Sequence, residues 1–333
     1  MDKLLIIDGN AIVHRAFHAL PPLTEKNGKQ VNAVYGFFSM LLKVIEDVKP
    51  THIIVCFDRP KPTFRKLMYA GYQAHRPQMA DGLSGQFGIL YQALEKIGIQ
   101  MFGVDGYEAD DVIGTLAAQA ARINTKTSNI KSQISNNGEN NLKLDIGNLK
   151  FEIVILSGDR DLLQLVNSHV KVMMPVTGIS NMLVHDEKSV EEKYGIKPQQ
   201  FIDYKALVGD ASDGYPGVGG IGPKTAAGLL QKFENFENLY HQMSVLPPKI
   251  AEKLAIDAEQ AAMAKKLATI ITDVPVTLKL AECSIENIDK EVIAEVFEEL
   301  NFESLKKRLW MMKIIKSVEE KRKEKLGTQL GLL

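Results

Sequence analysis

The sequence predicts an α/β protein with a parallel twisted sheet flanked by helices, followed by a mainly helical C-terminal part. Short, continuously apolar segments alternate with segments of helical periodicity through the first half of the 333 residues. This alternation is typical of parallel sheets, whose strands are buried on both faces. Three of the apolar segments lead directly into acidic residues. Side chains that follow parallel strands gather at one edge of a sheet, where ligands bind.

The composition agrees with a globular protein and excludes several other classes. Hydrophobic residues make up 45% and charged residues 24% of the chain, and the formal net charge is −1. The first apolar run is too short for a signal peptide, and no run reaches the length that spans a bilayer. We therefore expect a cytoplasmic location. Cys56 and Cys283 suit a reducing compartment and are too few for a thiolate zinc site.

The predicted elements of the first hundred residues follow in a regular order. Residues 3–8 and 51–58 are predicted strands, and each ends in an aspartate, Asp8 and Asp58. Between them, residues 33–48 place apolar side chains on one face of a helix. A further helix is predicted for 87–97 and a further strand for 99–102.

Residues 59–83 differ from these elements because they have no clear apolar face. Basic and aromatic side chains such as Lys66, Tyr72 and Arg76 are mixed there with glycine and proline. A solvated loop is the simplest interpretation. A long excursion between core elements often has a function, however, and basic and aromatic side chains together can contact phosphates and bases.

Three carboxylates, Glu108, Asp110 and Asp111, stand at the start of a helix that is predicted to end near Ile123. One or two acids there would only complement the helix dipole. Three crowded acids repel one another unless a cation lies among them. Residues 124–150, rich in Asn, Ser and Lys, are predicted to form a disordered surface insertion.

Acids from other segments are expected at the same edge of the sheet. Asp159 and Asp161 follow a predicted strand over 151–156, as Asp8 and Asp58 follow theirs. Four separate segments, counting the acidic helix start, thus bring carboxylates to one place. This convergence indicates a divalent-cation site more strongly than any single stretch does.

The second half contains a further acidic pair and a glycine-rich turn. A helix predicted for 197–208 leads to Asp210 and Asp213, and then to the turn 217–227, which opens another helix. The turn lacks the spacing and strand context of a Walker loop or a dinucleotide fingerprint. A tight helix–helix turn and a phosphate-binding helix start, with Lys224 beside it, are both open interpretations.

The order of these motifs resembles that of the 5′–3′ exonuclease and flap endonuclease family, in particular the N-terminal nuclease domain of bacterial DNA polymerase I and its stand-alone relatives. The resemblance runs from the first strand to about Leu309, apart from the insertion. The matching segments are 7–10, 57–58, 107–111, 157–163, 207–213 and, for a helix-hairpin-helix element, 217–226.

This resemblance implies a PIN-like, resolvase-like nuclease core that binds two or more Mg²⁺ or Mn²⁺ ions. Two such ions about 4 Å apart can activate water and stabilise a leaving oxygen without a histidine base. The implied ligands are Asp8, Asp58, Glu108, Asp110, Asp111, Asp159, Asp161, Asp210 and Asp213. Of these, Asp111, Asp210 and Asp213 are expected at an outer position. A K⁺ ion at the helix-hairpin-helix is also implied.

The resemblance further implies DNA contacts, with residues 59–83 forming a helical arch through which a 5′ strand passes. Arg15 and Phe17 follow the first acid as in the family. Tyr72 and Arg76 match its Tyr-Lys-x-x-Arg pattern and are expected to take part in catalysis. The expected DNA-binding residues are Arg15, Phe17, Lys66, Tyr72, Arg76, Gly217, Gly220, Gly222, Lys224 and Thr225.

The chain departs from the family pattern at three places. Gln73 replaces the lysine that helps to neutralise the reacting phosphate in relatives, and Lys66 is the candidate substitute. Gly214 and Tyr215 stand where Asn-Ile is usual, and Arg160 replaces a common lysine.

We expect a nuclease core over 1–172 and, over 173–333, a helix-hairpin-helix domain with C-terminal helices, of which 293–309 carry an apolar face. The leading hypothesis is a 5′–3′ exonuclease and structure-specific 5′ flap endonuclease that acts in replication and repair. The alternatives are an RNA-cleaving PIN-type nuclease and a non-catalytic or weakly active DNA-junction binding module, the latter prompted by Gln73. The expected partners are DNA with 5′ ends, flaps or RNA primers and a separate DNA polymerase. We expect a monomer that does not bind membranes.

Overall fold

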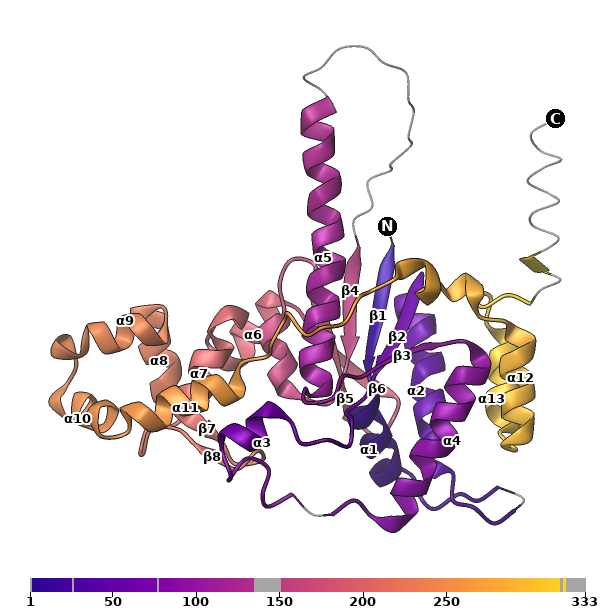
Figure 1. The fold of residues 1–333 in the computed structure, drawn as a ribbon, viewed down its shortest axis with the longest axis horizontal. Coiled ribbons are helices and arrows are strands. Elements are labelled where there is room, and N and C mark those ends of the chain that lie inside the picture. Colours follow the sequence, from indigo (N-terminus) through magenta and orange to yellow (C-terminus); the bar gives the residue numbers. More distant parts are fainter. Residues whose placement is uncertain (1, 26, 77, 135–150, 318–319, 322–333) are drawn as a thin grey trace.

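A six-stranded sheet with the order β3-β2-β1-β4-β5-β6 forms the centre of the protein (Figure 1). The computed structural model describes residues 2–25, 27–76, 78–134, 151–317 and 320–321. The strands are β1 (Lys3–Asp8), β2 (His52–Cys56), β3 (Gln100–Phe102), β4 (Glu152–Leu156), β5 (Val170–Thr177) and β6 (Asn181–His185). The first five run parallel, as predicted, whereas β6 pairs antiparallel with β5 at the edge. The sheet is therefore mixed.

The central strand β1 is buried because helices cover both of its faces. Leu5 and Ile7 belong to one apolar cluster, whereas Leu4 and Ile6 belong to another on the opposite face. All four side chains are fully buried. This continuous apolar run explains why the strand could be predicted from sequence. Asp8 ends the strand at its carboxyl edge.

Two groups of helices enclose the sheet. One face is covered by α1 (Gly9–Ala19), α2 (Asn32–Val48), α4 (Asp81–Ile97), α12 (Lys290–Glu299) and α13 (Glu303–Met311). The other face packs against α5 (Ala109–Ile134), α6 (Glu187–Tyr194), α7 (Phe201–Val208) and α8 (Pro223–Phe233). Beyond α8, the helices α9 (Phe236–His241), α10 (Pro248–Ile256) and α11 (Ala258–Ala268) extend to one side of the sheet (Figure 1).

Several element boundaries differ from those predicted. Helix α5 continues to Ile134, so the start of the predicted insertion is helical, while 135–150 lie outside the described residues. The apolar face predicted over 293–309 is divided between two helices, α12 and α13, because the chain turns at Asn301, whose φ of 61° is left-handed. None of the described helices is long and apolar enough to cross a membrane.

The expected division at residue 172 passes through β5 and does not follow the packing. Strands β5 and β6 belong to the central sheet. Helices α12 and α13 pack on α4 and α2, far from helices α8 to α11 (Figure 1). We therefore place the C-terminal helices with the sheet rather than with the domain that contains α7 to α11.

Candidate metal centre

Five carboxylates from four segments meet at the carboxyl edge of the sheet. Asp8 ends β1, Asp58 follows β2 and Asp110 lies in the first turn of α5. Asp159 and Asp161 lie in the turn after β4. Asp110 lies within electrostatic reach of the other four. Burial raises its pKa well above the ordinary value, and the negative charges of Asp159 and Asp8 raise it further. The predicted convergence of these five acids is present in the structure.

Asp8 is held in a fixed orientation by two donors. The backbone N–H of Ala11 donates to Oδ1 at 3.0 Å, which caps α1, and the hydroxyl of Ser157 donates to Oδ2 at 2.6 Å. Burial raises the pKa of Asp8 to about 7, although these hydrogen bonds oppose the rise. Sequence reasoning did not identify Ser157 as a site residue. Its position directly after β4, which pairs with β1, was the available signal.

Asp58 and Asp159 are also oriented by backbone groups. The N–H of Ala109 donates to Oδ1 of Asp58 at 2.8 Å, and the N–H of Asp58 donates to Asn10 at 3.0 Å. The N–H of Asp161 donates to Oδ1 of Asp159 at 2.9 Å and caps the short 3₁₀ helix Arg160–Leu165. The acids therefore point into the centre from rigid element ends.

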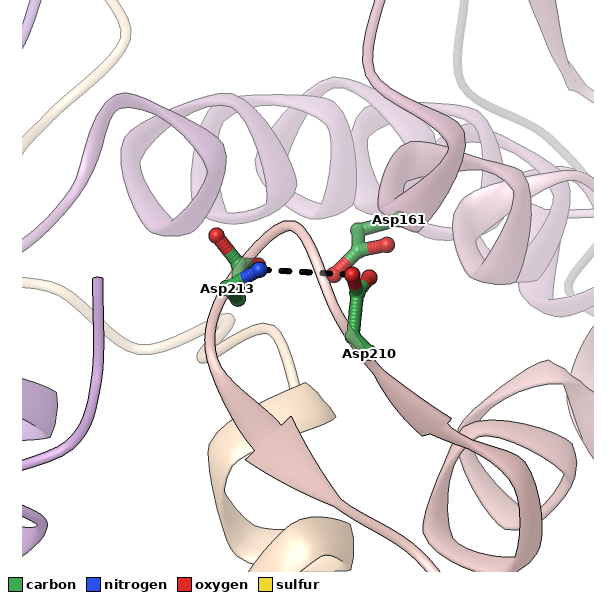
Figure 2. A group of neighbouring side chains, drawn as sticks. All are labelled: Asp161, Asp210 and Asp213. Carbon is green, nitrogen blue, oxygen red and sulfur yellow. Dashed lines mark hydrogen bonds between the residues drawn. The ribbon is translucent and has the colours of Figure 1, made fainter. Parts of the chain in front are cut away.

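Asp161, Asp210 and Asp213 form a second, outer acid group. Each offers an oxygen within 4.8 Å of the others, and Figure 2 shows the three side chains together at the turn between β7 (Gly209–Asp210) and β8 (Tyr215–Pro216). The N–H of Asp213 points to Oδ1 of Asp210 at 3.3 Å. Burial raises the pKa of Asp161 to about 7, and the charge of Asp159 adds to the rise.

Lys205 of α7 is a residue of this outer group that sequence reasoning missed. Its Nζ donates to both Asp161 and Asp210. Burial raises the pKa of Asp210 on its own, but hydrogen bonding and the charge of Lys205 outweigh burial and lower it. The signal in the sequence was a lysine about one helical turn before Asp210. Gly209, with φ of 77°, turns the chain back toward that lysine.

Glu108 and Asp111 differ from the five converging acids because an arginine of the protein binds both of them. Arg65, in the short helix α3 (Phe64–Met68), donates to both oxygens of Asp111 at 2.7 and 2.8 Å and to Glu108 at 3.1 Å. Asp111 is fully buried and also accepts the N–H of Ile271 at 2.9 Å. Both of its oxygens are thus used by protein donors. Sequence reasoning noted the basic character of this segment but not this buried partner.

Three of the predicted arch residues, Tyr72, Gln73 and Arg76, donate hydrogen bonds to acids. The hydroxyl of Tyr72 donates to Glu108 at 3.0 Å. Arg76 donates to Asp213 at 2.7 Å, and the side-chain amide of Gln73 donates to the same oxygen at 3.1 Å. Lys66 is exposed.

Arg15 and Phe17 lie on α1 beside the sheet edge. The guanidinium of Arg15 donates to the carbonyl oxygens of Val176 at 2.8 Å and Gly178 at 3.1 Å, where β5 turns toward β6. Phe17 is partly buried against the core. Arg15 therefore supports this turn in the structure.

The glycine-rich turn between β8 and α8 passes close to the backbone of β7. A Cβ on Gly217 would lie 2.3 Å from the N of Gly209, and Gly220 has a φ of 71°. Gly222 precedes the 11-residue helix α8, whose first turn carries the exposed Lys224 and Thr225. This helix start faces solvent.

A protein cation already lies at the carbonyl groups of this turn. The Nζ of Lys253 donates to the carbonyl oxygen of Gly220 at 2.9 Å, and the side chain of Gln260 donates to the carbonyl oxygen of Gly217. The N–H of Gly219 donates to Asp257 at 2.7 Å. The K⁺ ion expected at the hairpin would therefore share the carbonyl oxygen of Gly220 with Lys253 and that of Gly217 with Gln260.

The donor set fits hard divalent cations. It consists of carboxylate oxygens, the ligands preferred by Mg²⁺ and Mn²⁺. Burial raises the pKa of Asp8 and of Asp161, and repulsion from neighbouring acids such as Asp159 adds to the rise. A cation with two charges would relieve this repulsion.

The protein thus combines a mixed sheet, which carries a candidate metal centre at its carboxyl edge, with a helical part that carries a candidate phosphate-binding turn. These features define a class of α/β proteins. The chain belongs to the 5′–3′ exonuclease family. Residues 3–133 match the N-terminal resolvase-like domain of the family, and residues 196–291 match its C-terminal SAM fold. The family and fold expected from the motifs are thus confirmed.

Known proteins agree with this assignment. DNA polymerase I of Bacillus caldotenax is 38% identical over 330 residues, which cover 99% of this chain and 34% of the polymerase. DNA polymerase I of Bacillus subtilis strain 168 is 37% identical over 308 residues, which cover 92% of this chain and 32% of the polymerase. The chain spans about a third of the length of these curated relatives. A bacteriophage T5 flap endonuclease, solved as a pseudo-enzyme–product complex with DNA and metal ions, shares the fold with a TM-score of 0.61 at 19% identity, covering 92% of this chain and 98% of that one.

Proposed function

We propose that the chain is a metal-dependent 5′–3′ exonuclease and 5′ flap endonuclease that hydrolyses phosphodiesters in DNA with a free 5′ end. The observation that carries the proposal is the convergence of Asp8, Asp110 and Asp159, from three segments, at the sheet edge beside the arch. A protein that only bound DNA would gain nothing from acids beside phosphate. The family membership and the T5 flap endonuclease neighbour support the same activity.

Asp8, Asp58, Asp110, Asp159 and Asp161 would hold Mg²⁺ or Mn²⁺ at the sheet edge. The bound ions would supply an activated water and a counter-charge for the leaving oxygen. Hydrogen bonds from Ser157 and from backbone N–H groups fix the carboxylates beforehand, so that little reorganisation is needed when substrate binds. Asp111 would serve the site indirectly, by anchoring Arg65.

Basic side chains on the arch would orient the reacting phosphate. Burial raises the pKa of Asp58, and the positive charges of Arg76 and Lys66 oppose this rise. Both side chains therefore lie within electrostatic reach of the centre. This supports Lys66 as the substitute for the lysine that Gln73 replaces. Tyr72 would act by holding Glu108.

The helical hairpin would bind the duplex part of the substrate. The start of α8 presents unpaired backbone N–H groups to solvent, with Lys224 and Thr225 beside them, which suits a backbone phosphate. The polymerase relatives support a DNA polymerase as a partner, and the T5 flap endonuclease neighbour supports flaps as substrates. RNA primers as substrates stay a prediction.

The test is cleavage of a 5′-labelled flap duplex under single-turnover conditions. Wild type should cleave it with Mg²⁺ and not with EDTA, and Asp159→Ala should be slower by at least about a hundredfold because a ligand is lost. Asp47→Ala, which removes an exposed acid on α2, is the matched control and should cleave normally.

The other outcomes separate the competing functions. Metal-independent cleavage, or full activity in Asp159→Ala, would contradict the metal centre. Tight flap binding without cleavage would favour the junction-binding module, for which Gln73, engaged with Asp213, is the specific observation. Cleavage of single-stranded RNA in preference to the flap would favour the RNA-cleaving nuclease.

A further inference from the structure

Lys205 places a positive charge inside the outer acid group. Its ammonium donates to Asp161 and to Asp210, and it is only 9% exposed. An ammonium and a divalent cation are alternative counter-ions for the same carboxylates, and two cations at one place repel each other. The outer position therefore already contains a cation that belongs to the protein.

We call Asp8, Asp110 and Asp159 the inner acids, and in the described part of the chain they have no lysine comparable to Lys205 beside them. Among the described residues, no lysine, arginine or histidine forms an ion pair with Asp8, Asp110 or Asp159. Asp213, by contrast, is paired with Arg76. The inner and outer acids thus differ in how much of their charge the protein itself neutralises.

Tyr215 lies beside Lys205 and has an unused hydroxyl. Asp210 and Tyr215 are directly opposite in the β7–β8 pair, which places their Cβ atoms about 5 Å apart. Tyr215 is 3% exposed, and its oxygen is buried without a hydrogen-bond partner among the described residues. A buried hydroxyl without a partner is destabilising, so its presence needs an explanation. Burial raises the pKa of Tyr215 and the charge of Lys205 opposes the rise, which agrees with their proximity.

We propose that Lys205 is an exchangeable counter-ion of the outer metal position. It neutralises Asp161 and Asp210 while no divalent cation is bound there, and it moves to the hydroxyl oxygen of Tyr215 when one binds. Lys205 is then a positioning residue that makes the outer site weaker than the inner one. Cations fill the inner acids first and reach the outer group only at higher concentration. This inference rests on the proposed function, since it concerns the same metal centre.

The test is a Mn²⁺ titration of the full chain without DNA, with free Mn²⁺ measured by electron paramagnetic resonance. We expect a tighter and a weaker class of sites in the wild type. Lys205→Met keeps the length of the side chain but removes its charge, so the weaker class should tighten by roughly tenfold or more while the tighter class is unchanged. Lys205→Arg keeps the charge and should retain the weak class.

Tyr215→Phe tests where the lysine goes. The ring and its stacking on Tyr72, at 6.3 Å and 16°, are kept, and only the acceptor is lost. The displaced ammonium then has no partner, so the weaker class should weaken several-fold. An unchanged weaker class in Lys205→Met, or in Tyr215→Phe, would overturn the exchange.

Thermal unfolding guards against a variant that simply fails to fold. In EDTA, Lys205→Met should melt below wild type because Asp161 and Asp210 lose their counter-ion, and Mn²⁺ should raise its melting temperature by more than that of wild type. An equal rise in melting temperature for the two proteins would also overturn the proposal that Mn²⁺ displaces Lys205. These results are independent of flap cleavage: a failed cleavage assay would remove the proposed function, whereas unchanged Mn²⁺ affinities with normal cleavage would remove only the role of Lys205.

Discussion

The carboxylate of Asp8 has a structural role that exists without any cation. One oxygen caps α1 and the other accepts the hydroxyl of Ser157, so β1, α1 and β4 are joined through one side chain. The same burial that makes these bonds effective keeps solvent from the charge. The side chain of Asp8 is therefore already oriented to bind a cation, but its ionised form is unfavourable until a cation binds.

This conflict predicts an unusual pH dependence of stability. The pKa of Asp8 is raised to about 7 from 3.8, so folding favours its protonated form. That stabilisation is complete below about pH 4 and is lost as the pH rises through about 7. In EDTA, Asp8→Asn, which mimics the protonated acid, should match wild type at pH 4 and melt at a higher temperature at pH 8. Differential scanning calorimetry measures both, and a wild type that is the more stable protein at pH 8 would contradict the raised pKa.

Gln73 gives a second prediction at the scale of one residue. Its side-chain amide is uncharged and donates to Asp213, so it cannot help to neutralise the phosphate. Gln73→Lys should raise the single-turnover rate of flap cleavage, by roughly tenfold if one added charge stabilises the transition state. An unchanged rate would show that Lys66 already supplies the charge, and Lys66→Met should then be slow in the wild-type background.

At this scale the sequence predicted the acids but not the groups that hold them. Asp8, Asp58 and Asp159 are recognisable because each follows an apolar strand. Ser157 and Lys205 are ordinary residues in sequence, and they gain their roles only when β4 meets β1 and when Gly209 turns the chain back. Such contacts depend on tertiary structure and leave no periodic pattern.

Among the elements, α3 illustrates how a short helix is kept in place. Its five residues are too few to be stable alone. Arg65 anchors it by donating to Asp111 and to the carbonyl oxygens of Leu267 and Thr269. The base of the arch is thereby joined to α5 and to the end of α11.

Loss of one partner of this buried pair should be strongly destabilising. Arg65→Met leaves the charge of Asp111 buried, and we expect a loss of about 3–5 kcal/mol in the free energy of unfolding. Lys61→Met is the matched control, because Lys61 and Asp105 form an exposed pair on the same segment at 2.6 Å, for which a change under about 1 kcal/mol is expected. Urea denaturation measures both. Similar losses in the two variants would contradict the anchoring role of Arg65.

Elements with a strong apolar period were predicted closely, and those without one were not. The predicted helix 33–48 corresponds to α2 (Asn32–Val48), which buries one face on the sheet. The last residues of α5 are polar, so they form no apolar period from which a helix could be predicted. The break between α12 and α13 depends on one left-handed residue, Asn301, inside an otherwise continuous apolar pattern.

At the scale of the whole molecule, the order of elements along the chain does not match their packing. β5 and β6 complete the sheet after the position where a boundary was predicted. The last two helices return to α2 and α4, which belong to the first hundred residues of the chain. Periodicity identifies which face of a helix is apolar, but not which distant element covers it.

The returning helices should be as necessary for folding as the sheet itself. Phe297 and Phe302 are fully buried in the cluster formed by α2 and α4, together with Leu309. Each such side chain contributes about 1.5–3 kcal/mol by burial, so the group is comparable to the whole stability of a domain. Phe297→Ala should lower the free energy of unfolding by about 3–5 kcal/mol and reduce flap cleavage at 37 °C through unfolding alone.

Trp310→Ala provides the comparison, because Trp310 is on the same pair of helices but 50% exposed. Its loss should cost under about 1 kcal/mol. Cleavage at 10 °C separates stability from chemistry: Phe297→Ala should recover the wild-type rate there, since α12 packs mainly on α4 and α13 and supplies no proposed ligand of the metal centre. If the two variants unfold at the same urea concentration, the C-terminal helices are not part of the core. That result would support the predicted division at residue 172.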